Sequence, residues 1–296
     1  MTLNADQRTR LEEALNRTFF ATHAPEFKSS PAFRQTLDDH TFNRQSHFAD
    51  CVVPWLRRHV DIGDHHVVEI GAGTGSSTAA IAPHVGHVTT FEIDQRAIVA
   101  AKARAEICRY SNVTYRTTLF GNEQADELGF YDGVFLAAVL EHCSFQECHD
   151  LLKASWSRLK PGGWLCVIDT PNRFCPIDHH TSYLPFFSSL PIDVRIAYSA
   201  KSPRAEFGQS FANPGKDDVN RMIRWGCGIS YHEFEIAIDE DIHENIIADG
   251  WEPEINAALG ILPEDTFIEN QMTSFAPHVN RAFARRALYF VLRKPS

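Results

Sequence analysis

The sequence predicts an α/β protein whose parallel sheet is covered by helices on both faces, and three observations indicate this class. Between residues 65 and 170, short apolar runs alternate with segments of helical periodicity, which is the pattern of such a sheet. A glycine-rich turn follows the first apolar run. The alternation lapses after Thr170 and resumes near the carboxyl end with a final apolar run, Ala287–Arg293.

Composition and charge narrow the classes of function. The 296 residues hold 28 Lys and Arg against 38 Asp and Glu, a net charge of −10, and 44% are hydrophobic, which is enough for a full core. An acidic chain is a poor partner for the phosphates of nucleic acid. No apolar run approaches the roughly 18 residues that span a bilayer. We therefore expect neither nucleic acid nor a membrane as a partner.

Cysteine usage indicates the compartment. Seven cysteines are scattered along the chain without a CxxC pair. An odd number of isolated thiols is typical of a reduced protein and not of a disulfide framework. Residues 1–10 are polar, unlike a signal peptide. We expect a cytoplasmic protein.

Residues 1–64 are predicted to form a helical cover. Apolar residues recur at helical spacing after a cap at Asn4 or Asp6. A second helix is expected from about Phe48 to Val60, with Pro54 near its first turn.

Residues 65–170 form the predicted core. Ser144 and Glu147 make a capping box at the start of its third helix, and Lys160-Pro161-Gly162-Gly163 ends that helix. Strands are expected at 66–70, 87–91, 113–117, 133–139 and 164–170, and helices at 76–82, 96–107 and 144–159.

Two further segments complete the chain. Residues 171–230 carry six prolines and are predicted to be a lid inserted before the sheet is completed. Residues 231–296 are expected to complete the core with a helix near 232–249, a strand near Glu254–Leu259 and the final strand Ala287–Arg293.

The glycine-rich turn lies in the sequence VVEIGAGTG, residues 67–75. Glycines let a backbone approach a ligand closely and leave N–H groups facing it. A dinucleotide-binding enzyme is the competing interpretation, but its G-x-G-x-x-G fingerprint does not fit, because the third glycine comes one residue early and Ser76 follows it. Glu69 would also suit a cationic ligand and repel a pyrophosphate.

A second acid follows the next strand. Glu92 lies 21 residues beyond Gly71, where a carboxylate can accept hydrogen bonds from ribose hydroxyls. Alone, this acid also fits a nicotinamide cofactor. Together, the two motifs suggest an adenosine that carries a positive centre in place of phosphates.

Four motifs in this order and spacing, VVEIGAGTG, FEID, YDGVFLAAVLEHC and LKPGGWLCVIDTPN, resemble those of the class I S-adenosylmethionine-dependent methyltransferases. The resemblance covers about residues 64–172. It implies a doubly wound, mostly parallel, seven-stranded Rossmann-like sheet with an antiparallel last strand, to which the helical cover and the inserted lid are added. S-adenosylmethionine would lie at the carboxyl ends of the first strands.

The resemblance also implies a set of cofactor contacts. Glu92 would hold the ribose hydroxyls, and Ile93 would lie beside the adenine. Thr118-Leu119-Phe120 stands where the family often places an acid, which leaves backbone groups or stacking on Phe120 to recognise the adenine. The turn would line the methionine part of the cofactor with Glu69, Gly71, Ala72, Gly73 and Gly75.

Candidate catalytic residues follow the fourth and fifth strands. The resemblance places Ala137, Ala138 and His142 at the methyl group. An oxygen acceptor usually needs a base to remove its proton, and we expect His142 or His180 in that role, with Asp178 next. The alternatives are a structural hydrogen bond for His142 and a plain surface loop around His180.

A metal ion is considered but not predicted. Some members of the family hold magnesium with oxygen ligands after these two strands, which here would be Glu141, Asp169 and Asn172. Asp169 could equally close its strand. No Cys and His pairs have the spacing of a zinc site.

The predicted function is S-adenosylmethionine-dependent methyl transfer to an oxygen of a small polar acceptor. In the lid, six cations stand against three acids between residues 195 and 224, which suggests a sugar-like or anionic small-molecule substrate, although a solvated face explains them as well. N-methylation of a small molecule, S-adenosylmethionine binding without catalysis and a nicotinamide enzyme are the alternatives. The amino-terminal helices could cover the site or form the contact of a homodimer.

Overall fold

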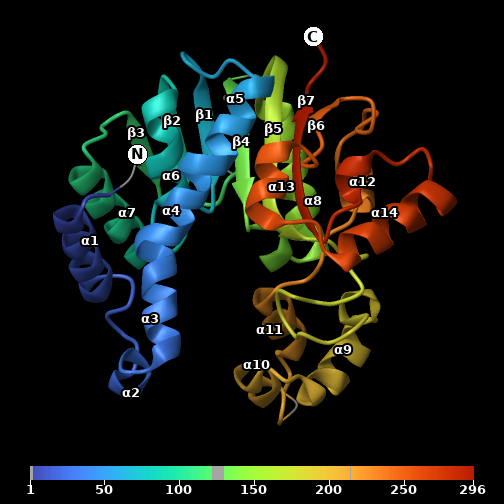
Figure 1. The fold of residues 1–296 in the computed structure, drawn as a ribbon, viewed down its shortest axis with the longest axis horizontal. Coiled ribbons are helices and arrows are strands. Elements are labelled where there is room, and N and C mark those ends of the chain that lie inside the picture. The colour runs from blue at the N-terminus through green and yellow to red at the C-terminus, as the bar shows by residue number, and fades with distance from the viewer. Residues whose placement is uncertain (1–2, 122–129, 214) are drawn as a thin grey trace. The chain divides into compact units, whose positions relative to one another are not determined.

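The computed structural model describes residues 3–121, 130–213 and 215–296 (Figure 1). Its strands are β1 His66–Ile70, β2 His87–Phe91, β3 Val113–Arg116, β4 Tyr131–Ala137, β5 Leu159–Pro171, β6 Ile246–Ala248 and β7 Ala287–Arg293. They form one sheet in the order β3-β2-β1-β4-β5-β7-β6. β1, β2 and β3 pair in parallel, and β7 runs antiparallel to β5 and β6. The predicted α/β sheet with seven strands and an antiparallel last strand is confirmed.

The chain divides into two compact units, residues 1–135 with 253–258 and residues 136–252 with 259–296. The helices of the first unit are α1 Ala5–Arg17, α2 Pro25–Lys28, α3 Pro31–Asp38, α4 Arg44–His47, α5 Val53–His59, α6 Ser76–Ile81, α7 Gln95–Cys108 and α13 Pro253–Leu259, the last up to residue 258. Those of the second unit are α8 Phe145–Arg158, α9 Ile192–Tyr198, α10 Ala205–Ser210, α11 Asp218–Trp225, α12 Tyr231–Ala237 and α14 Pro263–Phe275.

In the first unit, the amino-terminal helices pack on the helices that follow β1 and β2. Asn4 caps α1, because its side chain accepts a hydrogen bond from the Gln7 N–H at 2.9 Å and Gln7 returns one to the Asn4 N–H. The buried face of α1 meets α7 and α6 in one apolar cluster. Burial of such an apolar face provides most of the stability of a short helix in a folded protein. The cluster contains Leu3, Leu11, Leu15, Phe20, Phe33, Leu37, Ala79, Ala100, Ile107 and Cys108.

The second predicted helix is longer than expected. Helical backbone runs from Pro31 to His59, with π-helical turns at Asp39–Asn43 and Phe48–Val52 between α3, α4 and α5. Pro54 lies at the start of α5, directly after the π-helical turn Phe48–Val52.

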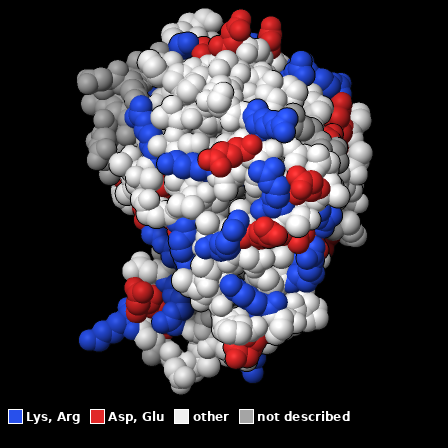
Figure 2. Space-filling model, turned by 90° about the vertical axis from the view of Figure 1, so that its left-hand side faces the viewer, with Lys and Arg blue, Asp and Glu red and all other residues white. Residues whose placement is uncertain are grey.

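Charges of both signs are mixed over the surface. The face in Figure 2 shows basic and acidic side chains interspersed. Ion pairs join some of them, including Arg8 with Asp38 at 2.6 Å and Arg34 with Glu12 at 2.9 Å. Such exposed pairs stabilise a fold by about 1 kcal/mol at most. The acidic side chains do not form a single patch on the face that Figure 2 shows.

In the second unit, the segment 171–230 has a small core of its own. The short helices α9, α10 and α11 lie here, and Phe187 and Phe207 are buried while Tyr183 and Phe186 are exposed. The aromatic residues therefore split between packing and surface. The buried cluster is Leu184, Phe187, Phe207, Phe211 and Met222.

Three predicted elements need correction, two of them near the carboxyl end and one at the start of β5. The strand expected at Glu254–Leu259 is the helix α13, which begins at Pro253 and buries Ile255. The helix expected near 232–249 ends at Ala237, and β6 follows at Ile246. β5 begins at Leu159, so Lys160-Pro161-Gly162-Gly163, which was predicted to end a helix, already belongs to a strand. In this stretch, the Gly162 N–H donates to Lys294 O at 3.0 Å, just beyond the end of β7.

All seven cysteines are free thiols, and five of them are buried. Burial raises the pKa of Cys51, Cys143 and Cys175 to about 11. It also raises the pKa of Cys108, Cys148, Cys166 and Cys227. These side chains therefore act as small apolar groups. Among the described residues, no helix combines the length and the hydropathy needed to cross a membrane.

One buried cation joins the parts of the first unit. Arg104 of α7 is fully buried, and its Nε donates to Thr74 O at 2.9 Å in the glycine-rich turn. The same guanidinium donates to Thr41 O at 3.2 Å, to Gln45 Oε1 at 2.6 Å and to His40 O. Burial lowers the pKa of Arg104 to about 10, so the group stays charged at neutral pH.

Arg104→Met should therefore destabilise the fold. Four buried oxygens would lose their donor, and an unsatisfied buried acceptor costs about 1–3 kcal/mol. We expect the free energy of unfolding in urea to fall by roughly 3–5 kcal/mol. Lys102→Met, on the exposed side of the same helix, is the matched control and should change it by less than about 0.5 kcal/mol. Equal losses in the two variants would contradict this role of Arg104.

Candidate functional site

The glycine-rich turn lies between β1 and α6 in the first unit. Gly71, Gly73 and Gly75 all have left-handed backbone, with φ of 73°, 53° and 78°. The Gly71 N–H donates to Phe91 O at 2.8 Å, which ties the turn to the end of β2. A Cβ added to Gly73 would meet no atom within 4 Å, so the backbone there borders open space.

Glu92 holds the turn from the end of β2. Its two carboxylate oxygens accept hydrogen bonds from the N–H groups of Gly73 and Asp94, both at 2.8 Å. A carboxylate offers about four lone-pair sites. The side chain is half-buried and so retains acceptor capacity toward a ligand. The predicted contact of Glu92 with a pair of ribose hydroxyls stays a prediction.

Glu69 lies behind the turn and not on its open side. The side chain is buried, and its carboxylate accepts hydrogen bonds from the hydroxyls of Ser77 and Thr78 in α6. Burial raises the pKa of Glu69, while the two hydroxyls oppose that rise. Glu69 therefore connects β1 to α6, and any effect on a cationic ligand would act through the turn.

The apolar side chains after β2 and β3 differ in exposure. Ile93 is 65% exposed and Leu119 is 60% exposed, so both can contact a ligand. Phe120 is 8% exposed, and its ring packs edge-on against Phe91 with centroids 5.0 Å apart. Ala72 is likewise buried in the turn. Ligand contact by Phe120 stays a prediction, although its ring is occupied by the core.

Ala138 belongs to the second unit, directly after β4. Its backbone is left-handed, with φ of 54°, and its N–H donates to Ile168 O of β5 at 3.0 Å. A non-glycine residue in this conformation is uncommon and marks a strained turn. The turn leads into the short 3₁₀ helix Leu140–His142.

Three side chains gather after β4 and β5 in the second unit. The nearest nitrogens of His142 and His180 lie 3.8 Å and 3.9 Å from Glu141 Oε1. The two imidazole centroids are 5.5 Å apart. Glu141 is fully buried, and the histidines are partly exposed. The two predicted bases are thus brought together beside the carboxylate of Glu141, which the sequence also offered as a metal ligand.

Asp178 organises the turn that carries His180. Its Oδ1 accepts hydrogen bonds from the N–H groups of His180 at 3.2 Å and Thr181 at 3.0 Å. Its Oδ2 accepts from the N–H of Ser182 at 2.9 Å and from the Ser182 hydroxyl at 2.7 Å. The carboxylate is buried, so its geometry is that of a positioning group, and its predicted role as a base remains untested.

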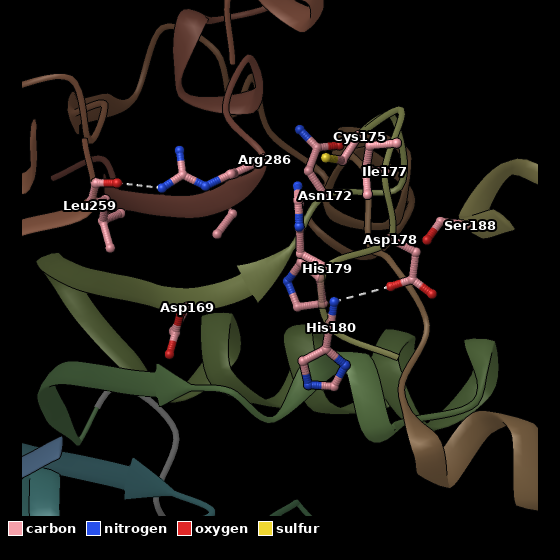
Figure 3. Close-up of a pocket in the computed structure, with 12 residues that line it drawn as sticks. Asp169, Asn172, Cys175, Ile177, Asp178, His179, His180, Ser188, Leu259 and Arg286 are labelled. Carbon is pink, nitrogen blue, oxygen red and sulfur yellow. Dashed lines mark hydrogen bonds between the residues drawn. The ribbon is translucent and has the colours of Figure 1, made fainter. Parts of the chain in front are cut away.

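A pocket of about 230 Å³ adjoins the cluster (Figure 3). Figure 3 shows Arg286 turned toward Leu259 and the His180 ring set below the Asp178 turn. Arg286 donates to Leu259 O and forms an ion pair with Asp265, so its charge is already compensated. The pocket is lined by Asp169, Pro171, Asn172, Cys175, Ile177, Asp178, His179, His180, Ser188, Leu259, Arg286 and Ala287.

Three of the six cations between residues 195 and 224 are engaged within the second unit. Arg224 pairs with Glu147 at 2.6 Å. Arg221 donates to Ser210 O at 2.6 Å, and Arg204 donates to His180 O at 2.9 Å. These three cations hold the segment together, which weakens the inference of an anionic substrate from their number.

The magnesium ligands considered above do not form a set. Asn172 donates from its amide to Phe283 O and Arg285 O, both at 2.7 Å, and accepts from the Phe174 N–H at 2.9 Å. Its side chain is therefore used for structure. Asp169 is exposed at the end of β5 with φ of 57°.

The sequence did not indicate the roles of Thr74 and His40. His40 Nδ1 lies 3.1 Å from Thr74 Oγ1 in the turn, and the His40 ring packs against Phe19 and Phe20. No local pattern links residues 34 positions apart. Arg104, in contrast, has a readable signal, because a single cation on the apolar stripe of an alanine-rich helix predicts a buried charge.

Comparison with known proteins gives the chemical class of this site. Residues 68–165 match the family model described as "Methyltransferase domain". The chain is 34% identical over 116 residues to equisetin synthetase of Fusarium heterosporum, covering 37% of this chain and 3% of that protein. It is 33% identical over 112 residues to demethylmenaquinone methyltransferase of Tropheryma whipplei, covering 36% and 44%. The chain thus spans less than half the length of these curated relatives.

One solved structure that matches part of the chain is the N-methyltransferase NodS from Bradyrhizobium japonicum WM9 in complex with S-adenosyl-L-homocysteine. The identity is 22%, the match covers 53% of this chain and 72% of that chain, and the TM-score is 0.36.

The stability of the first unit should depend on pH through His40. Burial, together with Arg44 and Arg104, lowers the pKa of His40 from 6.5 to about 3. Because the unfolded chain takes up this proton near pH 6.5 and the folded chain does not, stability is complete above that pH and is lost as the pH falls toward 3.

Between pH 6.5 and pH 5, we expect this histidine to cost about 1–2 kcal/mol of unfolding free energy. Urea titrations of His40→Gln should recover that loss at pH 5. The control His179→Gln, whose ring is half exposed, should follow the wild type. A His40→Gln protein with an unchanged pH slope would contradict the assignment.

Proposed function

Because residues 68–165 form a class I S-adenosylmethionine-dependent methyltransferase domain, we propose that the chain transfers a methyl group from S-adenosylmethionine to an oxygen of a small polar acceptor. The observation that carries the choice of oxygen is the cluster of Glu141, His142 and His180 beside the pocket. An oxygen acceptor must lose a proton, and these side chains are of the kind that removes one.

The residues of the first unit fit the methyl donor. Gly73 borders open space, and Glu92 keeps acceptor capacity beyond its two bonds to backbone N–H groups. Ile93 offers an exposed apolar surface for an adenine ring. S-adenosylmethionine, when bound, supplies an activated methyl group and its own neutral leaving group. The protein's contribution is then to hold the acceptor in line and to keep water away.

The pocket in the second unit suits a neutral polar acceptor better than an anion. Asp169 and Asp178 contribute two carboxylates to its lining, and the one cation there, Arg286, is paired with Asp265. Ile177 and Leu259 add apolar surface. A hydroxyl-bearing molecule would find an acceptor for its hydrogen in Asp169, whereas an anion would be repelled by the two carboxylates.

His180 is the residue of the cluster that lines the pocket, so we assign it the proton of the acceptor hydroxyl. His142 and the buried Glu141 would stabilise the positive charge that results, since a carboxylate near an imidazolium favours it. Asp178 acts through its hydrogen bond to the His180 backbone and is a positioning residue.

Two alternatives predict different behaviour of the same residues. An N-methyltransferase acting on a free amine needs less help from a base, and Asp169 could attract the amine. A protein that binds S-adenosylmethionine without catalysis would need neither histidine. Replacing the histidines therefore separates the three functions.

The donor site can be tested by calorimetry with S-adenosylmethionine. Gly73→Asp adds a carboxylate to the open side of the turn and should weaken binding by at least about 100-fold, because the new side chain fills the ligand's space. Gly260→Asp is the matched control, since Gly260 also has positive φ and open surroundings. Unchanged affinity in Gly73→Asp, or equal loss in both variants, would exclude this donor site.

Methyl transfer itself can be tested with a labelled methyl donor and a small-molecule extract, followed by separation of the labelled products. His180→Ala and His142→Ala should slow transfer to oxygen by about 10²–10⁴-fold, the usual contribution of a general base. His149→Ala, on the outer side of α8, should not slow it. Full rates in both site variants would favour an amine acceptor, and tight donor binding without any labelled product would favour the binding protein.

A further inference from the structure

We propose that Glu141, His142 and His180 bind a divalent transition-metal cation. One ligand atom from each residue lies within 4.8 Å of the other two. The three side chains come from the 3₁₀ helix after β4 and from the turn after β5, and all belong to the second unit. Two imidazoles and one carboxylate are a ligand set for zinc, iron, cobalt or manganese rather than for magnesium.

The hydrogen bond of His142 defines which of its nitrogens faces the cluster. His142 Nδ1 lies 3.1 Å from the carbonyl oxygen of Arg224. A carbonyl can only accept, so Nδ1 carries the hydrogen. In the neutral ring, Nε2 is then the nitrogen with the lone pair, and it is the atom 3.8 Å from Glu141 Oε1.

His180 is held in the same tautomer by a chain of two hydrogen bonds. The Thr181 hydroxyl donates its single hydrogen to the carbonyls of Gly226 and Trp225, at 3.0 Å and 3.3 Å. It must therefore accept from His180 Nδ1, which lies 3.0 Å away. The Nε2 lone pair of His180 then faces Glu141 Oε1 at 3.9 Å.

The three ligand atoms thus face one small space. Both distances to Glu141 Oε1 exceed the roughly 3.2 Å of a direct hydrogen bond. A divalent cation between them would be attracted by the carboxylate and would accept the electron pairs of both imidazoles. Ligand atoms at about 2.0–2.2 Å from a tetrahedral ion lie roughly 3.3–3.6 Å apart, so a small inward movement of the side chains completes the site.

One short segment, residues 224–227, supports all three ligands from outside. The Cys227 N–H donates to Glu141 O at 2.7 Å, while the carbonyls of Arg224 and Gly226 take the bonds described above. A Cβ on Gly226 would come within 2.5 Å of His180 Cε1, so only glycine lets the segment pass against this ring. Ligating histidines characteristically donate their other N–H to such carbonyls or hydroxyls, which orients the ring.

The role of the cation in the reaction rests on the proposed function. His180 lines the pocket, so coordination positions left open by the three ligands could take the acceptor oxygen. A bound cation would lower the pKa of a coordinated hydroxyl, and the hydroxyl would then give its proton to water. The cation and a proton use the same Nε2 lone pair of His180, so in the metal-bound protein the cation would take over the role in deprotonation that the proposed function gives to His180.

The test is a cobalt titration of the full chain after removal of metals with a chelator. Cobalt(II) bound to imidazole and carboxylate gives visible absorption, and we expect it to saturate at one equivalent and to be displaced by zinc. Glu141→Gln, His142→Ala and His180→Ala should each weaken cobalt binding by at least about 100-fold. His179→Ala is the matched control and should bind like the wild type, because His179 faces Glu264 at 3.2 Å.

Far-ultraviolet circular dichroism shows whether each variant is folded, and His180→Gln provides a milder second change at the same position. No saturable cobalt band in the wild type, or an equal loss in His179→Ala, would overturn the proposal. Transfer of the labelled methyl group without cobalt or zinc binding would refute the metal site alone. Cobalt binding without any methyl transfer would refute the proposed function alone.

Discussion

The buried guanidinium of Arg104 is the constraint on which the first unit depends. It holds carbonyl oxygens from two separated stretches of chain, His40 with Thr41 and the turn at Thr74, and each of these would lose a donor without it. The glycine-rich turn, whose three glycines have no side chains to pack, thereby gains a support from α7. Glu69 and Glu92 complete this support from β1 and β2. The geometry of the turn is thus determined mainly by three charged side chains around it.

Local sequence signals predicted the elements whose packing agrees with their own periodicity. The strands at 66–70, 87–91 and 287–293 have the expected bounds, and the caps at Asn4 and Ser144 form as expected. The prediction of a strand at Glu254–Leu259 was wrong, because six residues of mixed polarity fit either a strand or a helix. Only the packing of this segment against the rest of the fold decides between the two. There, the Cys51 thiol donates to Glu254 O at 3.5 Å and Arg58 pairs with the Glu254 side chain. Such contacts join residues about 200 positions apart, and no sequence window contains them.

The candidate site shows the same division between local and distant information. Glycines and acids next to strand ends were predictable, since their positions follow from the strands themselves. The meeting of His142 with His180 was not, because it depends on the Asp178 turn and on the segment 224–227. The surplus of cations between 195 and 224 depends on distant contacts for the same reason. Arg204, Arg221 and Arg224 bond to carbonyls and to Glu147 within the second unit, so their packing explains part of the surplus, and an anionic acceptor stays a prediction.

The free thiols have a consequence for how the molecule can be handled and observed. A cysteine reacts as its thiolate, and burial disfavours the thiolate at all seven positions. An odd number of cysteines therefore poses little risk of cross-linking between copies while the fold is intact. The same shielding turns these residues into native reporters, because alkylation would proceed at the rate at which each core opens. Cys108 would report on the first unit and Cys166 on the second, without any added label.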